Sequence, residues 1–236
     1  MIGLNKTIIV GHRGTPLLAK ENTLASFTKA IEIGADMIEF DVRKTKDGIM
    51  MVHHNPSIAG HPIHQLTYQE ANQLVSSQGF VIPTVEEVLK LTQGKIKLDI
   101  EVKEVGYERE VLDLVLKYSK KDDFLMTSFH DQSLGVIKQH FPEIKVGLLL
   151  GGRPRLMQLF YHSDLFPEKR YQKIKADFLI AHYQLLKSGF LERAVHNKIG
   201  VYVWTVDNPI LLTKLLNDNR VGAVITNKPD LAITLA

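Results

Sequence analysis

Charged residues stand at alternate positions in two apolar runs of the chain. Glu39 and Asp41 lie within Ile-Glu-Phe-Asp-Val, and Glu101 and Lys103 lie within Glu-Val-Lys. Side chains alternate along a β-strand, so the two members of each pair point to one face. Buried carboxylates are costly unless they are paired or bind a cation. The carboxylates of Glu39, Asp41 and Glu101 together predict a site for one divalent cation, Mg²⁺ or Ca²⁺. The alternative is a structural ion-pair cluster of the carboxylates with Arg13 and Lys103.

Three histidines and an arginine lie close to these carboxylates in the expected fold. His12 follows the first apolar run on its inward face, where a single histidine is more often a core residue than a catalytic one. Arg13 is either an ion-pair partner or a planar fork for a phosphate group. His53 and His54 are adjacent, so they face opposite ways if both lie on a strand. Periodicity alone does not choose between them.

The elements that must position these residues alternate between strand and helix. The expected strands are residues 7–12, 36–42, 95–102, 124–128, 145–149, 177–181, 201–206 and 223–226. Helical periodicity is found at residues 23–33, 108–119, 131–140, 188–197 and 209–217. Eight such units predict an α/β fold, a single (β/α)₈ TIM barrel that fills residues 1–236 as one domain.

The second unit of this barrel is longer than the others. An extra strand at residues 49–54 and two helices near residues 69–76 and 84–91 precede the third barrel strand. We therefore expect a small insertion and connection over residues 55–94.

Active sites of such barrels lie where the strands end. Polar residues are found at several of these ends. They are His12 and Arg13, Glu39 and Asp41, Asp99, Glu101 and Lys103, Ser128, Trp204, and Asn227. One end of the barrel thus holds carboxylates, two cations and at least one histidine.

The composition excludes several kinds of chemistry. The chain has 236 residues and no cysteine, which rules out disulfides, thiolate metal sites and a cysteine nucleophile. A net charge of +3 with scattered Lys and Arg gives no reason to expect a nucleic-acid partner. No apolar run approaches the ~18 residues of a membrane span. The first motif begins at Gly11, which leaves no room for a signal peptide, so we expect a cytoplasmic protein.

An ordered set of short motifs resembles the glycerophosphodiester phosphodiesterase family, in its bacterial form with a short insertion after the second strand. The motifs are GHRG at 11–14, ENT at 21–23, EFDV at 39–42, TKDG at 45–48, HNP at 54–56, EVK at 101–103, TSF at 127–129, WTV at 204–206 and ITNKP at 225–229. They cover nearly the whole chain. No single triplet is specific, but their order and spacing are.

The resemblance implies a role for each matching residue. Glu39, Asp41 and Glu101 would hold the metal ion. His12 and His54 would be the general acid and base, because the family's second histidine precedes an Asp-Pro pair and His54 precedes Asn-Pro. The substrate-binding residues would be Arg13, Lys103 and Trp204. The reaction would be attack by the neighbouring glycerol hydroxyl, followed by hydrolysis of a cyclic phosphate to glycerol 3-phosphate.

Two residues depart from the family pattern. Asn55 and Asn227 stand where the family has Asp. An amide keeps the hydrogen-bonding shape and loses the charge, so the rate or the pH optimum is open to change. A carboxylate at position 55 would raise the pKa of the neighbouring imidazole.

Two other functions remain open at this point. A lysophospholipase D or a phosphoinositide phosphodiesterase would use the same fold. The mixed apolar and basic segment 155–174 could line an acyl groove or touch a membrane surface, although an ordinary outer helix is the better interpretation. A non-catalytic binding barrel, with Asn55 and Asn227 as marks of decay, is the third interpretation. The alcohol moiety, the cellular metal and the oligomeric state do not follow from the sequence.

Overall fold

A computed structural model describes residues 6–152 and 158–236, which form a closed barrel of eight parallel strands with one antiparallel strand added. The barrel strands are β1 (Ile8–Gly11), β2 (Met37–Lys44), β6 (Lys97–Val102), β7 (Phe124–Ser128), β8 (Val146–Leu150), β9 (Phe178–His182), β10 (Gly200–Trp204) and β11 (Val221–Thr226). The ring closes because β1 pairs with β2 on one side and with β11 on the other. This confirms the fold expected from the sequence.

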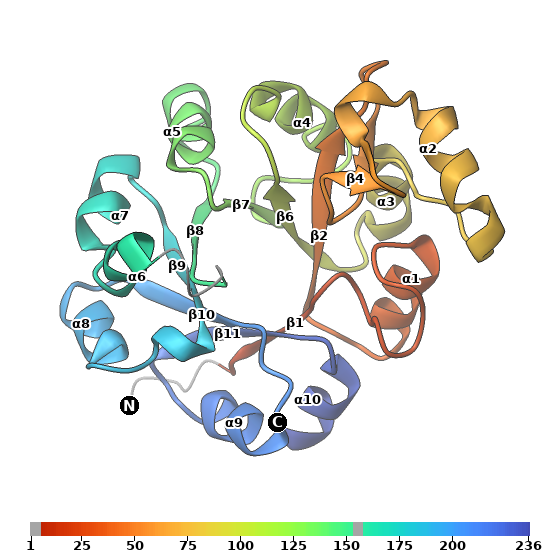
Figure 1. Cartoon of the computed structure of the whole chain (residues 1–236). Helices are drawn as coiled ribbons and strands as arrows, with labels where there is room; N and C mark the ends of the chain where they lie inside the picture. Colours follow the sequence, from red (N-terminus) through yellow and green to blue (C-terminus); the bar gives the residue numbers. More distant parts are fainter. Residues whose placement is uncertain (1–5, 153–157) are drawn as a thin grey trace.

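Helices surround this ring (Figure 1). They are α1 (Leu24–Glu32), α3 (Val85–Thr92), α4 (Glu108–Val115), α5 (Asp131–His140), α6 (Gln158–Leu165), α7 (Glu168–Ile174), α8 (Phe190–His196), α9 (Pro209–Leu216) and α10 (Pro229–Leu235). Apolar residues on the outer face of the strands, such as Ile38, Phe40 and Ile100, pack with helix residues such as Phe27 in the main core.

A second, smaller core fills the inside of the barrel. Its buried members come from strands alone: Val10, Met37, Leu125, Leu149, Ile180, Tyr202, Ala223 and Ile225. Alternation along each strand divides its residues between the two cores. Val10 is inward and Ile9 is outward on β1, for example. The polar residues at the ends of the strands therefore lie next to the apolar core inside the barrel.

The second unit contains the insertion. Strand β3 (Met50–Val52) pairs antiparallel with the end of β2, and a hairpin of β4 (Ser57–Ile58) and β5 (His61–Pro62) follows. Helix α2 (Tyr68–Val75) lies outside the ring in Figure 1. Capping boxes begin α2 and α3, where Thr67 pairs with Glu70 and Thr84 pairs with Glu87. A separate apolar cluster around Met51 and Ile82 holds this unit against β3.

The described part of the segment 155–174 is mostly helical, as the favoured interpretation of the sequence expected. Residues 155–157 lie outside the described residues, and residues 158–174 comprise α6, α7 and the two residues between them, at the barrel periphery. Phe166, between the two helices, is 41% exposed, and the guanidinium of Arg193 lies 4.5 Å from its ring centre. None of the described helices is long and apolar enough to cross a membrane.

Candidate active site

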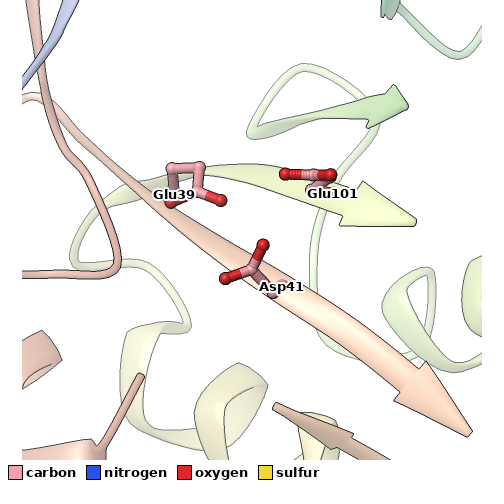
Figure 2. Close-up of side chains that lie close together, drawn as sticks. All are labelled: Glu39, Asp41 and Glu101. Carbon is pink, nitrogen blue, oxygen red and sulfur yellow. The ribbon is translucent and has the colours of Figure 1, made fainter. Parts of the chain in front are cut away.

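Three carboxylates meet at the ends of β2 and β6. The register of these parallel strands places Asp41 beside Glu101 and Glu39 beside Asp99. Glu39, Asp41 and Glu101 each offer an oxygen atom within 4.8 Å of the others, and all three residues are buried. Figure 2 shows the three side chains directed toward one another from the two strands. The alternation seen in the sequence is the cause, because outward neighbours such as Phe40 occupy the main core.

Burial makes this carboxylate group difficult to ionise. Burial, and then repulsion from Asp41, raises the pKa of Glu101 to about 8 and that of Glu39 well above its ordinary value. Burial also acts to raise the pKa of Asp41, but Lys103 and Arg13 together hold it below its usual range. Three acidic groups this close need more positive charge to ionise together. A divalent cation bound by oxygen ligands supplies such charge, so the donor set fits Mg²⁺ or Ca²⁺.

Two cations flank the carboxylates. The Lys103 ammonium lies 2.7 Å from a Glu101 oxygen and 3.1 Å from an Asp41 oxygen. Arg13 reaches Asp41 through its Nε, at 3.4 Å, and Glu21 through its Nη1, at 3.1 Å. The ion-pair cluster considered as the alternative to a metal site is thus present, and it coexists with the raised pKa values of Glu39 and Glu101.

The loop between β1 and α1 holds the carboxylates in place. The Arg13 backbone N–H donates to a Glu39 oxygen at 2.8 Å, and the Asn22 side-chain amide donates to an Asp41 oxygen at 2.7 Å. The Asn22 backbone N–H donates to the Arg13 carbonyl, which closes the loop on itself. Arg13 and Asn22 both have positive φ values, of 54° and 57°. Such backbone strain persists only where the surrounding structure enforces it.

His12 stands at the end of β1, beside the carboxylates. Its Nδ1 lies 2.7 Å from the Asn227 side-chain oxygen, and its Nε2 lies 3.9 Å from a Glu39 oxygen. Burial, and then the charge of Arg13, lowers the pKa of His12 to about 4. The imidazole is therefore neutral at neutral pH, which suits a proton acceptor.

The two adjacent histidines of the insertion have different positions. Strand β3 ends at Val52, so His53 and His54 lie just beyond it rather than on the strand expected over residues 49–54. His54 lines the same cavity as His12, whereas His53 is not among the described residues that line it. The His54 Nδ1 lies 2.9 Å from the Asn55 side-chain oxygen, and burial lowers the pKa of His54.

A cavity of about 180 Å³ is lined by most of these groups. Its described lining residues are His12, Arg13, Glu39, His54, Asp99, Glu101, Lys103, Thr127, Phe129, Leu149, Gly152, Trp204 and Ile225. The Trp204 indole N–H donates to the carbonyls of Leu150 and Ile180, and the Phe129 ring packs edge-on against the indole at 5.6 Å. The lining therefore combines aromatic side chains with ionic ones. Such a cavity suits a small ligand with an anionic group and a carbon skeleton.

Comparison with known proteins identifies a family for this constellation. The family model of the glycerophosphoryl diester phosphodiesterase family matches residues 12–231. The chain belongs to this family. The resemblance seen in the motifs is thus confirmed.

Individual members of the family are similar over nearly their full length. A glycerophosphodiester phosphodiesterase of Caldanaerobacter subterraneus subsp. tengcongensis is 28% identical over 249 residues, which cover 98% of each chain. The crystal structure of a glycerophosphodiester phosphodiesterase from Parabacteroides distasonis has a TM-score of 0.81 at 26% identity and covers 98% of this chain and 96% of its own. One from Thermotoga maritima has a TM-score of 0.76 at 28% identity and covers 98% and 99%.

Sequence reasoning missed one residue that contacts this site and one hydrogen bond within it. Asp207, in the loop after β10, holds Asn227 through three hydrogen bonds to that residue and its neighbour Thr226. Asn22 was seen in a motif, but its contact with Asp41 was not foreseen. Neither contact leaves a periodic signal, because each joins residues about 20 positions apart that meet only in the folded barrel. The sequence signal that could have identified Asp207 is its position directly after the strand expected over residues 201–206.

Proposed function

We propose that this chain hydrolyses glycerophosphodiesters to glycerol 3-phosphate and an alcohol, with one divalent cation, Mg²⁺ or Ca²⁺, at Glu39, Asp41 and Glu101. The observation that carries the proposal is the cavity itself, in which the buried carboxylates, two cationic side chains and two histidines face one small space. Relatives with the same family pattern are named for this activity.

A phosphodiester is an anion with two poor leaving groups, so its hydrolysis requires charge neutralisation and proton transfer. The bound cation would supply Lewis-acid stabilisation of the phosphoryl oxygens. Arg13 and Lys103 supply donors for the same oxygens, where preorganised positive charge lowers the barrier. Trp204 and Phe129 would contact the carbon skeleton of the glycerol.

The two histidines would move the protons. His12, neutral and buried, accepts a proton from the attacking hydroxyl at its Nε2. His54, in its protonated form, donates its Nε2 proton to the departing alcohol and becomes neutral. The two histidines then exchange roles while water opens a cyclic phosphate. General acid and base catalysis contribute about 10²–10⁴-fold each in enzymes. Both histidines have an amide oxygen close to Nδ1, from Asn227 and Asn55, so each amide supplies a hydrogen-bond acceptor at a position where the family pattern has Asp.

Attack by the substrate's own hydroxyl explains why no protein nucleophile is needed. Ser128, the nearest candidate by sequence, donates its hydroxyl to the Val102 carbonyl and is fully buried. An intramolecular hydroxyl gains an advantage that reaches about 7–11 kcal/mol in well-oriented systems.

Two substrate analogues test this step. A diester in which propane-1,3-diol replaces glycerol lacks the neighbouring hydroxyl and should bind but turn over at least about 100-fold more slowly. The ethylene glycol diester keeps that hydroxyl and should retain activity, with a cyclic phosphate visible by phosphorus NMR. Comparable turnover of both analogues would contradict intramolecular attack and indicate direct attack by water.

No specific contact among the described residues favours a lysophospholipid substrate. Phe166 belongs to the segment 155–174 that motivated the acyl-groove interpretation, and its ring is covered on one face by Arg193 and packs beside His162. A phosphoinositide substrate likewise has no contact among the described residues that favours it. A non-catalytic binding role is not favoured either, because the proposed histidines, cationic side chains and metal-binding carboxylates are all present; Asp41 belongs to the carboxylate cluster and the others line the cavity.

A further inference from the structure

Asp207 uses its two carboxylate oxygens for different purposes. Oδ1 accepts the Asn227 backbone N–H at 2.8 Å and the Thr226 hydroxyl at 3.1 Å, which ties the loop after β10 to the end of β11. Oδ2 accepts the Asn227 side-chain amide at 2.7 Å. A residue that only joined the loop after β10 to the end of β11 would need Oδ1 alone. The second oxygen is directed at the amide that contacts His12.

The chemistry of these groups fixes the orientation of the Asn227 amide. An ionised carboxylate only accepts hydrogen bonds, so the NH₂ group of Asn227 must face Asp207. The amide oxygen then faces His12, and it lies 2.7 Å from Nδ1. Because a carbonyl oxygen also only accepts, Nδ1 must carry the imidazole proton. In the neutral ring this leaves the lone pair on Nε2, the nitrogen that faces Glu39.

We propose that Asp207 is a positioning residue that acts through Asn227 to hold His12 as the Nδ1–H tautomer. The inference rests on the proposed role of His12 as the base, for which a free Nε2 is required. Without Asp207, the amide of Asn227 has no fixed orientation, since its oxygen and its NH₂ group have similar shapes. The carboxylate of Asp207 thus makes an amide at position 227 as definite an acceptor as an aspartate would be.

The isosteric variant Asp207→Asn tests the orientation directly. The new amide oxygen would keep the bonds to the Asn227 N–H and the Thr226 hydroxyl, and its NH₂ group would face the NH₂ group of Asn227. This conflict is relieved when Asn227 turns its amide over, which presents a donor to His12 Nδ1 and moves the proton to Nε2. We expect kcat to fall by about 10²-fold, the lower end of the value of a general base, with KM changed less than about threefold.

The double variant Asp207→Asn with Asn227→Asp should restore activity. The carboxylate introduced at position 227 would accept hydrogen bonds from both the amide introduced at position 207 and the Nδ1–H of His12. Every hydrogen bond that joins positions 207, 227 and 12 is thereby regained. We expect kcat within about tenfold of wild type. Asp122→Asn, at an exposed turn before β7, is the matched control for the loss of one negative charge and should leave kcat unchanged.

Nitrogen NMR of labelled histidines reports the tautomer of His12 independently of activity. The signals are assigned with His12→Gln, and the proton should reside on Nδ1 in the wild type and the double variant and on Nε2 in Asp207→Asn. A wild-type tautomer in Asp207→Asn, or a double variant as impaired as the single one, would overturn the proposal. Wild-type turnover in His12→Gln would instead overturn the proposed function and leave the tautomer result standing.

Discussion

Two adjacent histidines follow β3, and their different surroundings allow a test at the scale of the residue. His54 lines the cavity, while the His53 Nδ1 lies 3.0 Å from the Asn55 backbone oxygen. His54→Ala should lower kcat by about 10²-fold or more, because a proton donor to the leaving group is lost. His53→Ala serves as the matched control and should change kcat by less than about tenfold. Steady-state kinetics on glycerophosphocholine, with circular dichroism to verify folding, give the answer. Equal losses in both folded variants would contradict the assignment.

The sequence located most of the residues that line the cavity. Alternation in Glu39–Phe40–Asp41 was sufficient to place two carboxylates on one face, and the motifs selected His54 over His53. The chain of hydrogen bonds from Asp207 through Asn227 to His12 was not predictable, because it depends on how the loop after β10 meets the end of β11. A contact between side chains of two loops is set by the closed barrel rather than by any local pattern.

At the scale of the element, the β1–α1 loop is a part of the fold with little steric freedom. Gly14 has φ of +87°, and a Cβ there would lie 2.4 Å from the Ser26 hydroxyl and 2.8 Å from the Ser26 carbonyl carbon. Its neighbours His12 and Arg13 belong to the site. The backbone at Gly14 therefore couples the first turn of α1 to the proposed catalytic residues.

Gly14→Ala should damage both stability and activity. Unfavourable φ and the clash with Ser26 each cost about 1–3 kcal/mol, so the melting temperature should fall by roughly 4–24 °C in a chain of this size. The matched control is Gly34→Ala, since Gly34 also has positive φ (+79°) but has open space around its Cβ position. Thermal melts and kcat are measured for both. Equal shifts in the two variants, with activity kept, would show that the contact with Ser26 does not constrain the loop.

The boundaries of a strand were predicted correctly where turns flank it. They were predicted less accurately where pairing with another strand extends it. Residues 124–128 are a strand in both the prediction and the structure. Strand β2 continues to Lys44, two residues beyond the prediction, because its end pairs with β3. The hairpin of β4 and β5 was missed, since two-residue strands carry no periodicity. Helix α4 ends at Val115, short of the expected residue 119.

At the scale of the whole molecule, the barrel contains several buried carboxylic acids, and these make its stability depend on pH. Burial raises the pKa of Asp99 to about 7, and burial and then Asp41 raise that of Glu101 to about 8. In the unfolded chain both groups ionise at about pH 4. The folded metal-free protein thus binds more protons than the unfolded one up to about pH 8, so its stability falls as the pH rises toward that value.

The window above pH 6.5 isolates this effect. The lowered pKa of His12 gives an opposite slope only below its ordinary value of 6.5. In EDTA, we expect the melting temperature to fall by at least about 5 °C from pH 6.5 to 8.5. A tenfold change in proton affinity is worth ~1.4 kcal/mol of stability, and each 1 kcal/mol shifts the melting temperature of a chain of this size by ~2–4 °C. Saturating Mg²⁺ or Ca²⁺ should flatten the curve, and Glu101→Gln should remove most of the fall. A melting temperature that is constant or rises over this window in EDTA would contradict the account.

Metal-dependent hydrolysis is tested by measuring the release of glycerol 3-phosphate from a panel of glycerophosphodiesters, before and after removal of metal. We expect protein freed of metal with EDTA, and verified by elemental analysis, to lose activity by at least about 100-fold, because charge stabilisation worth several kcal/mol is removed. Added Mg²⁺ or Ca²⁺ should restore the rate. Glu101→Gln should be impaired to the same degree with metal present, while Glu110→Gln, at an exposed ion pair with Lys44, should retain wild-type activity. Full turnover by the metal-free protein would contradict a metal-dependent phosphodiesterase.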